Sequence, residues 1–168
     1  NGNRSLLADS NLSGMILGMT LQTKPEEIYR SLMEAAAFGA RMIVEHYRKH
    51  GIPITEFRAS GGISRKNPLM MQIYADVTGR TIRVAASKQA SALGAAIHAA
   101  VAAGPEAGGY ATTAEASARM ARLQEGAYIP NPENKAIYDR LYADYRTLYD
   151  YFGRGANDVM KRLMALRG

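Results

Sequence analysis

The sequence predicts an α/β fold that is rich in helices and has few strands. An apolar run at 54–60 breaks at two glycines and reopens at helical spacing, which is the order strand, loop, helix. A second, β-branched run at 81–85 precedes an alanine-rich helical stretch at 91–103. Two strands cannot cover the apolar faces of all the helices expected here. We therefore expect the 168 residues to be the C-terminal part of a larger α/β domain whose first strands lie upstream.

Composition and charge argue against several classes of protein. The formal net charge is +6, but lysine and arginine are spread from Arg4 to Arg167 without a basic tract, so we expect no nucleic-acid partner. No apolar run is long enough to cross a bilayer and no leader-like start is visible, so we expect no membrane partner and a cytoplasmic location. The chain has no cysteine and its three histidines form no cluster, so no structural metal is expected.

The most strongly predicted helix begins after Thr23 and ends before Gly51. The run from Thr23 to Glu26 matches a capping box, with Pro25 in the first turn. Apolar residues then follow the helical period of about 3.6 residues. They are Ile28, Leu32, Ala35, Ala36, Gly39, Met42, Ile43 and Tyr47. This stripe predicts an amphipathic helix.

The strand expected at 52–60 leads into a glycine loop and a second helix. Gly61 and Gly62 give the backbone the freedom for a tight loop. Asn67, followed by proline, suits the cap of a helix over 67–78. Such a loop before a helix lets a phosphate approach the main chain closely, although the same pattern also occurs in simple turns.

Short signals delimit the elements that follow. Gly79 ends the second helix, and the alternating run at 81–85 predicts a second strand. The small residues of 91–103 predict a helix that can lie close to a sheet. Residues 104–130 are rich in glycine, alanine, threonine and proline, so we expect a surface connection with one short helix near 113–121.

The C-terminal region predicts a long helix with an aromatic face. Asn131 and Pro132 provide its start, and apolar residues recur at helical spacing. They are Ile137, Tyr138, Leu141, Tyr142, Tyr145, Leu148, Tyr149 and Phe152. A tyrosine stripe of this kind is typical of a packed core or of an interface. A last amphipathic helix is expected at 157–167, and these two helices are candidates for a homo-oligomer interface.

Three motifs, in order along the chain, resemble the FGGY family of carbohydrate kinases. The first extends from Gly14 into the helix at 27–34 and fits every specified position of the family's C-terminal signature. The second is Ala-Ser-Gly-Gly-Ile-Ser at 59–64, with Gln-Ile-Tyr-Ala-Asp-Val-Thr-Gly after it, and the third is Ser-Ala-Leu-Gly-Ala-Ala-Ile at 91–97. They are similar to the family's adenosine-binding loop and closing helix. The resemblance covers residues 1–152.

The resemblance implies the second, nucleotide-side domain of an ATP-dependent sugar kinase, with an actin-like, ribonuclease-H-like fold. Within the family, residues 1–14 and the tyrosine-rich helix look most like the branch that phosphorylates L-ribulose in arabinose catabolism. ATP and Mg²⁺ are the implied cofactors. The catalytic aspartate and the N-terminal sugar-binding domain are expected upstream. The alternative within the family is another pentulose or hexulose kinase, such as one that acts on D-xylulose.

The resemblance also implies which residues hold the nucleotide. Gly61 and Gly62 match the glycines that lie against the adenosine and the α-phosphate. Asn67 is expected near the adenine or ribose, but it follows the glycines one residue later than usual, so Ser64 and Lys66 compete for that role. Helix capping is a further role for Asn67 and does not exclude a ligand contact. No catalytic residue and no metal ligand is predicted in this chain.

Asp9 and Asp76 are the two carboxylates considered for a catalytic role. Asp9 lies in the opening loop and Asp76 near a helix end, where we expect solvated or structural roles.

A non-enzymatic helical assembly module, joined through the C-terminal helices, is the alternative to an enzyme. As a kinase fragment without its base, the chain alone should not phosphorylate L-ribulose, because loss of a general base typically forfeits about 10² to 10⁴ in rate.

Overall fold

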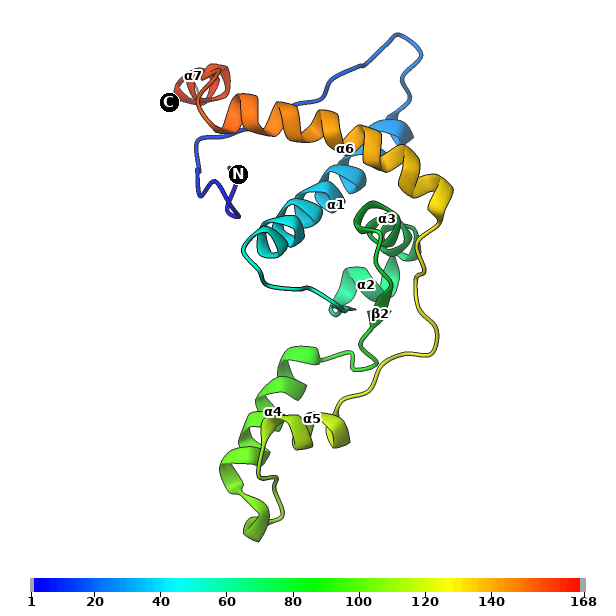
Figure 1. Ribbon diagram of the computed structural model, residues 1–168, viewed down its shortest axis with the longest axis vertical. Helices are drawn as coiled ribbons and strands as arrows, with labels where there is room; N and C mark the ends of the chain where they lie inside the picture. The colour runs from blue at the N-terminus through cyan, green and yellow to red at the C-terminus, as the bar shows by residue number, and fades with distance from the viewer. Residues whose placement is uncertain (1, 167–168) are drawn as a thin grey trace. The chain divides into compact units, whose positions relative to one another are not determined.

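The computed structural model describes residues 2–166 (Figure 1). The chain folds into two compact units. The first, here called the helical unit, comprises Asn1–Ile54 with Asn131–Gly168. The second, here called the sheet unit, comprises Thr55–Pro130. The first and last segments of the chain therefore build one unit, and the middle segment builds the other.

Three helices form the described part of the helical unit. They are α1 (Pro25–Lys49), α6 (Pro132–Gly153) and α7 (Val159–Ala165). Asn1 of the opening motif and Arg167 of the predicted last helix lie outside the described residues. Within residues 2–166, no helix is both long and apolar enough to cross a membrane.

Helix α6 packs its aromatic face against α1, as Figure 1 also shows. The ring centroid of Phe38 lies 6.1 Å from Tyr138, 5.9 Å from Tyr142 and 5.3 Å from Tyr145. Tyr138 and Tyr142 are buried. Aromatic side chains of this size supply most of the apolar surface buried in such a core. The packing role predicted for the tyrosine stripe is therefore confirmed.

The buried face of α1 differs from the predicted stripe. Met33, Ala37 and Phe38 are buried, whereas Leu32 is 56% exposed. Leu32 and Ala35 instead line an open, largely apolar cavity of about 560 Å³ in the helical unit. The predicted helix is confirmed, but α1 is apolar on two faces, and the face that carries Phe38 meets the aromatic face of α6.

The start of α1 lies one residue later than the predicted capping box. The N-cap is Lys24, whose backbone N–H donates to Glu27 Oε2 at 2.8 Å. The hydroxyl of Thr23 instead accepts from the N–H of Thr20 at 2.8 Å, within the preceding turn. The predicted cap at Thr23 was therefore wrong, because Pro25 takes the first helical position and leaves Lys24 as the cap.

The sheet unit is built around two short parallel strands. Strand β1 (Phe57–Ala59) pairs with β2 (Ile82–Val84), and the register places Phe57 beside Ile82 and Ala59 beside Val84. The parallel pairing agrees with the predicted strand, helix, strand order. The strand predicted at 52–60 is much shorter in the structure, because only these three residues have a partner on β2.

The sheet unit also contains four helices and a short 3-10 turn within its described residues. They are α2 (Gly62–Lys66), α3 (Pro68–Thr78), α4 (Ala90–Ala103) and α5 (Thr113–Met120), with a 3-10 turn, η1, at Pro105–Ala107. Helix α3 contacts β2 and supplies much of the core through Ile73, Ala75 and Val77. Helix α4 lies beside α5 (Figure 1), although its small residues predicted close approach to a sheet.

A backbone pairing that the sequence did not predict adds a third segment to the sheet. Ile82 and Tyr128 exchange N–H to O=C hydrogen bonds at 3.0 and 2.9 Å, and the N–H of Gln124 donates to Val84 O at 2.8 Å. The segment 122–128 therefore runs antiparallel to β2. The segment is at the surface, as predicted for 104–130, but its pairing with β2 was not predicted, because long-range pairing leaves no local pattern in a glycine-containing stretch.

Candidate functional site

Two loops meet at the carboxyl edge of the parallel pair. Gly61 follows β1, and residues 85–89 follow β2. The guanidinium of Arg65, on α2, donates through Nη1 to the carbonyl of Ala86 at 2.7 Å. This bond ties the two loops together. In open α/β sheets, ligands bind outside the carboxyl ends of the strands, so this edge is the candidate site.

Gly61 and Gly62 expose their main chain at this edge. Gly61 has φ +90° and ψ −178°, a conformation that L side chains rarely adopt. A Cβ built on either glycine would meet no other atom within 4 Å. The space over both residues is therefore open. A Cβ at Gly62 would fit there without displacing a neighbouring atom. An open approach to the backbone is what a nucleotide phosphate or ribose needs.

The expected tight loop after the glycines contains a short helix instead. Residues Gly62–Lys66 form α2, and the chain then turns at Asn67 (φ −128°, ψ 82°) into α3. The prediction of a loop up to Asn67 was wrong because three polar residues follow Ile63 and none of them breaks a helical turn. Asn67 both ends α2 and begins α3.

The other three predicted site residues differ in how accessible they are. Ser64 is buried, and its hydroxyl donates to the Gly61 carbonyl at 2.9 Å, so it holds the glycine turn in place. Asn67 is half-buried, and its Oδ1 accepts from the N–H of Met70 at 2.9 Å, which confirms the predicted cap. Lys66 is exposed, and within residues 2–166 it has no ion-pair partner. Four of the five residues thus present at least some surface at this edge.

The two carboxylates considered from the sequence have structural surroundings. Asp76 is 2% exposed, and the side-chain amide of Gln72 donates to it at 2.8 Å and to the Ile129 carbonyl at 2.9 Å. The N–H of Asn11 donates to Asp9 at 2.8 Å and lowers the pKa of that carboxyl. Among residues 2–166, no three His, Cys, Asp or Glu side chains are grouped so that they could hold a metal ion.

Arg65 is the residue at this edge that the sequence did not indicate. Its role rests on a contact with Ala86, which lies far along the chain, and a lone basic residue in a short polar run carries no signal for such a contact. Its side chain fixes the spacing between the loop after β1 and the loop after β2. It is therefore a positioning residue for the candidate site.

Relatives of this chain are sugar kinases. A ribulokinase of Halalkalibacterium halodurans is 60% identical over 167 residues, which is 99% of this chain and 30% of that relative. A ribulokinase of Mycolicibacterium smegmatis is 51% identical over 99% of this chain and 28% of its own length. The chain thus spans less than a third of the length of these curated relatives.

Solved structures show the same fold. The crystal structure of xylulose kinase from Rhodospirillum rubrum matches with a TM-score of 0.68 and 33% identity, over 82% of this chain and 27% of that chain. Ligand-bound xylulose kinase from Lactobacillus acidophilus matches with a TM-score of 0.78 and 22% identity, over 90% of this chain and 30% of that chain. The family model for the C-terminal domain of the FGGY carbohydrate kinases matches residues 1–103. That match covers more than half of the 168 residues, and so the chain belongs to the FGGY family of carbohydrate kinases.

Proposed function

We propose that this chain is the nucleotide-side part of an ATP- and Mg²⁺-dependent kinase that phosphorylates L-ribulose to L-ribulose 5-phosphate. The observation that supports it most is the open main chain of Gly61 and Gly62 at the carboxyl edge of the parallel strands. High identity to ribulokinases favours L-ribulose over other sugars. ATP supplies the phosphoryl group that is transferred.

The residues around the glycine turn have different parts in this proposal. Gly61 and Gly62 allow the nucleotide to lie against the backbone, and Ser64 keeps Gly61 in its positive-φ conformation through the 2.9 Å bond to its carbonyl. Lys66 can pair with a phosphate as a mobile point charge. Asn67 caps α3 through Oδ1, and in this proposal its side-chain amide nitrogen contacts the adenine or ribose.

We place the general base, the sugar pocket and the metal ligands in the part of the enzyme that this chain does not span. Phosphoryl transfer to a sugar hydroxyl needs a carboxylate close to that hydroxyl. Asp9 and Asp76 are occupied in structural contacts, and the described residues offer no cluster for a metal ion. Closure of two domains over the substrates would bring these groups together.

A coupled ADP-release assay tests the proposed activity. The full-length parent is assayed with Mg²⁺, ATP and one of L-ribulose, D-ribulose or D-xylulose, beside the isolated 168-residue chain. We expect turnover of L-ribulose by the parent and none by the chain alone. A parent that prefers D-xylulose would favour the alternative within the family, which the likeness to a xylulose kinase keeps open. A parent inactive on all three sugars would overturn the proposal.

A nucleotide titration of the chain tests the site itself. We expect ATP to shift the amide resonances of residues 59–67, with weak affinity because the enclosing surface is absent. Gly62→Leu should abolish these shifts without unfolding the chain, since its side chain meets open space. The matched control is Ala118→Leu at an exposed position of α5. If ATP shifts the same amides in Gly62→Leu as in the wild type, the nucleotide binds elsewhere.

A further inference from the structure

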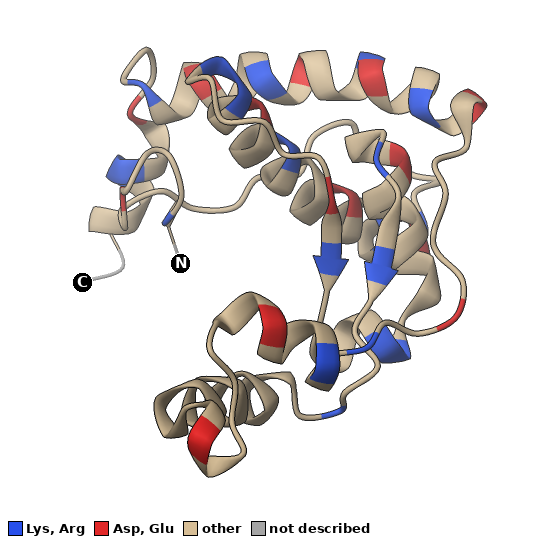
Figure 2. Cartoon of the chain, turned by 60° about the horizontal axis from the view of Figure 1, so that its bottom comes forward, with Lys and Arg blue, Asp and Glu red and all other residues tan. Residues whose placement is uncertain are grey.

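Two arginines stand side by side on the two parallel strands. Arg58 of β1 and Arg83 of β2 are partners in the strand register, and both are exposed. Figure 2 shows the two strands as neighbouring arrows that each carry basic colouring. Neighbouring strands lie only about 4.8 Å apart, and like charges in directly paired positions destabilise a sheet. A negatively charged group bound between them would relieve this repulsion.

The two paired arginines line a cavity together with a third arginine and two threonines. Arg80, which follows the end of α3, lines a cavity of about 460 Å³ together with Arg58 and Arg83. Thr55 and Thr81, which precede the two strands, also line it. The cavity thus lies at the amino ends of β1 and β2, and it uses none of the residues proposed to hold ATP. Its volume lies in the usual range for small-molecule sites, about 300 to 1,000 Å³.

The charge in this cavity is not balanced by the chain itself. Glu56 is the one carboxylate among the described lining residues, and its Oε2 accepts from Arg58 Nε at 3.0 Å and Nη2 at 2.6 Å. Arg80 and Arg83 have no ion-pair partner within residues 2–166. The carboxyl end of α3 contributes at most about half a negative charge. Three guanidinium groups and one carboxylate therefore leave the cavity positive.

We propose that this cavity, hereafter the arginine cavity, binds a small phosphate-bearing anion. The planar fork of a guanidinium donates two parallel hydrogen bonds to phosphate oxygens, and three such groups from two strands and a helix end surround one space. The threonine hydroxyls supply additional donors. A phosphate carries more than one charge near neutral pH, so it can meet Arg80 and Arg83 together.

Titration of the chain with inorganic phosphate and pyrophosphate at constant ionic strength tests this proposal. We expect the amide resonances of residues 55–58 and 79–83 to shift, and pyrophosphate to bind more tightly than phosphate. Arg83→Gln and Arg80→Gln should each weaken binding about tenfold, the usual effect of removing a hydrogen bond to a charged group. Arg83→Lys keeps the charge but loses the fork, so its loss should be intermediate.

Two control variants distinguish a defined site from general surface charge. Arg119→Gln removes an exposed arginine from α5 of the same unit and should change the affinity less than about twofold. Glu56→Gln frees Arg58 from its internal partner and should tighten binding, whereas Glu125→Gln at another exposed position should not. Equal losses for Arg83→Gln and Arg119→Gln, or no shift with either anion, would overturn the proposal.

The nucleotide variant separates this site from the proposed ATP site. Gly62→Leu should leave phosphate binding at residues 79–83 unchanged, and Arg83→Gln should leave the ATP shifts at residues 59–67 unchanged. If Gly62→Leu abolished the phosphate shifts at residues 79–83, the anion would be bound by the glycine turn and the arginine cavity would have no site of its own.

Discussion

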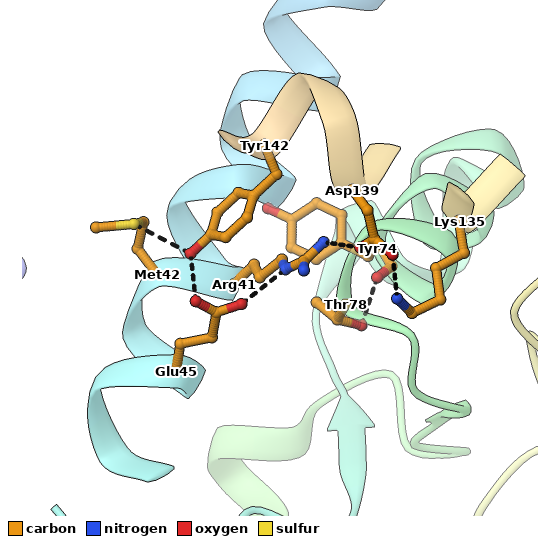
Figure 3. Close-up of polar contacts among 8 residues, drawn as sticks. All are labelled: Arg41, Met42, Glu45, Tyr74, Thr78, Lys135, Asp139 and Tyr142. Atoms are coloured by element: carbon orange, nitrogen blue, oxygen red, sulfur yellow. Dashed lines mark hydrogen bonds and ion pairs between the residues drawn. The ribbon is translucent and has the colours of Figure 1, made fainter. Parts of the chain in front are cut away.

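The hydroxyl of Tyr142 on α6 donates a hydrogen bond to Glu45 Oε2 on α1 at 3.0 Å (Figure 3). The other oxygen of that carboxylate accepts from Arg41 Nε at 2.9 Å, and the Arg41 guanidinium carbon lies 4.1 Å from the Tyr142 ring centroid. Arg41 Nη1 also contacts Asp139 at 2.7 Å, and Lys135 Nζ reaches the same carboxylate at 2.6 Å. A hydrogen-bonded and stacked cluster thus joins the two long helices of the helical unit.

Removal of the Tyr142 hydroxyl should weaken the contact between α1 and α6. Tyr142→Phe keeps the ring and its packing against Phe38 but leaves Glu45 with one donor fewer. We expect the free energy of unfolding to fall by about 1 kcal/mol, the typical value of one such bond. Urea denaturation measures it. Tyr47→Phe is the control, because Tyr47 is 45% exposed and should change the stability little.

The same hydroxyl makes the helical unit sensitive to alkali. Burial raises the pKa of Tyr142 above the ordinary value of 10.0, and the Glu45 charge and hydrogen bond raise it further. A raised pKa contributes stability that is complete below the unfolded value and is lost as pH rises toward the folded value. Wild-type stability should therefore fall between about pH 10 and pH 12, and that of Tyr142→Phe should fall less. An equally steep fall in the variant would contradict this assignment.

Asp139 should make the stability of the helical unit sensitive to acid. The hydrogen bond from Lys135, and then that from Arg41, lower the pKa of Asp139 below its ordinary value of 3.8. A lowered pKa contributes stability that is present above the unfolded value and lost as pH falls through the folded one. Asp139→Asn should be less stable at neutral pH but lose less of its stability below about pH 4. Denaturation curves at several acid pH values measure this, with exposed Asp144→Asn as control.

Local signals in the sequence predicted the ends of several elements. Asn67 and Asn131 cap α3 and α6 as expected, and Gly79 ends α3 with φ +64°. These signals succeed because cap and turn chemistry involves residues within about four positions of one another. The family resemblance added what local signals cannot, which is a predicted nucleotide-binding role for the Gly61–Gly62 turn.

Contacts between distant residues were not predictable in the same way. The pairing of segment 122–128 with β2, the burial of Phe38 against α6 and the Arg41–Asp139 ion pair all join residues far apart in sequence. The Arg41–Glu45 ion pair lies within α1 at i, i+4 spacing, whereas the Arg41–Asp139 ion pair joins α1 to α6. Each of these contacts depends on which apolar face meets which, and a helix such as α1 with two apolar faces leaves that choice open.

The two adjacent glycines should respond oppositely to alanine. Gly61→Ala places a side chain at φ +90°, which costs about 1 to 3 kcal/mol of backbone strain. Gly62→Ala lies at the start of α2 in open space, so it should be neutral or stabilise the chain by up to about 1 kcal/mol. Thermal unfolding of both variants measures the difference. A loss of equal size at both positions would show that Gly62 also needs glycine's conformational freedom.

Substitutions at Asn67 can separate its capping role from a nucleotide contact. Asn67→Ala removes the acceptor for the Met70 N–H and should cost about 1 kcal/mol of stability. Asn67→Asp keeps an acceptor and should retain the cap, but it replaces the amide donor with a negative charge that repels phosphate. If the amide touches the nucleotide, the aspartate variant will unfold like the wild type and yet lose the ATP-induced amide shifts at residues 59–67. If it keeps both its stability and those shifts, capping alone explains Asn67, and the nucleotide is held by the glycine turn and Lys66.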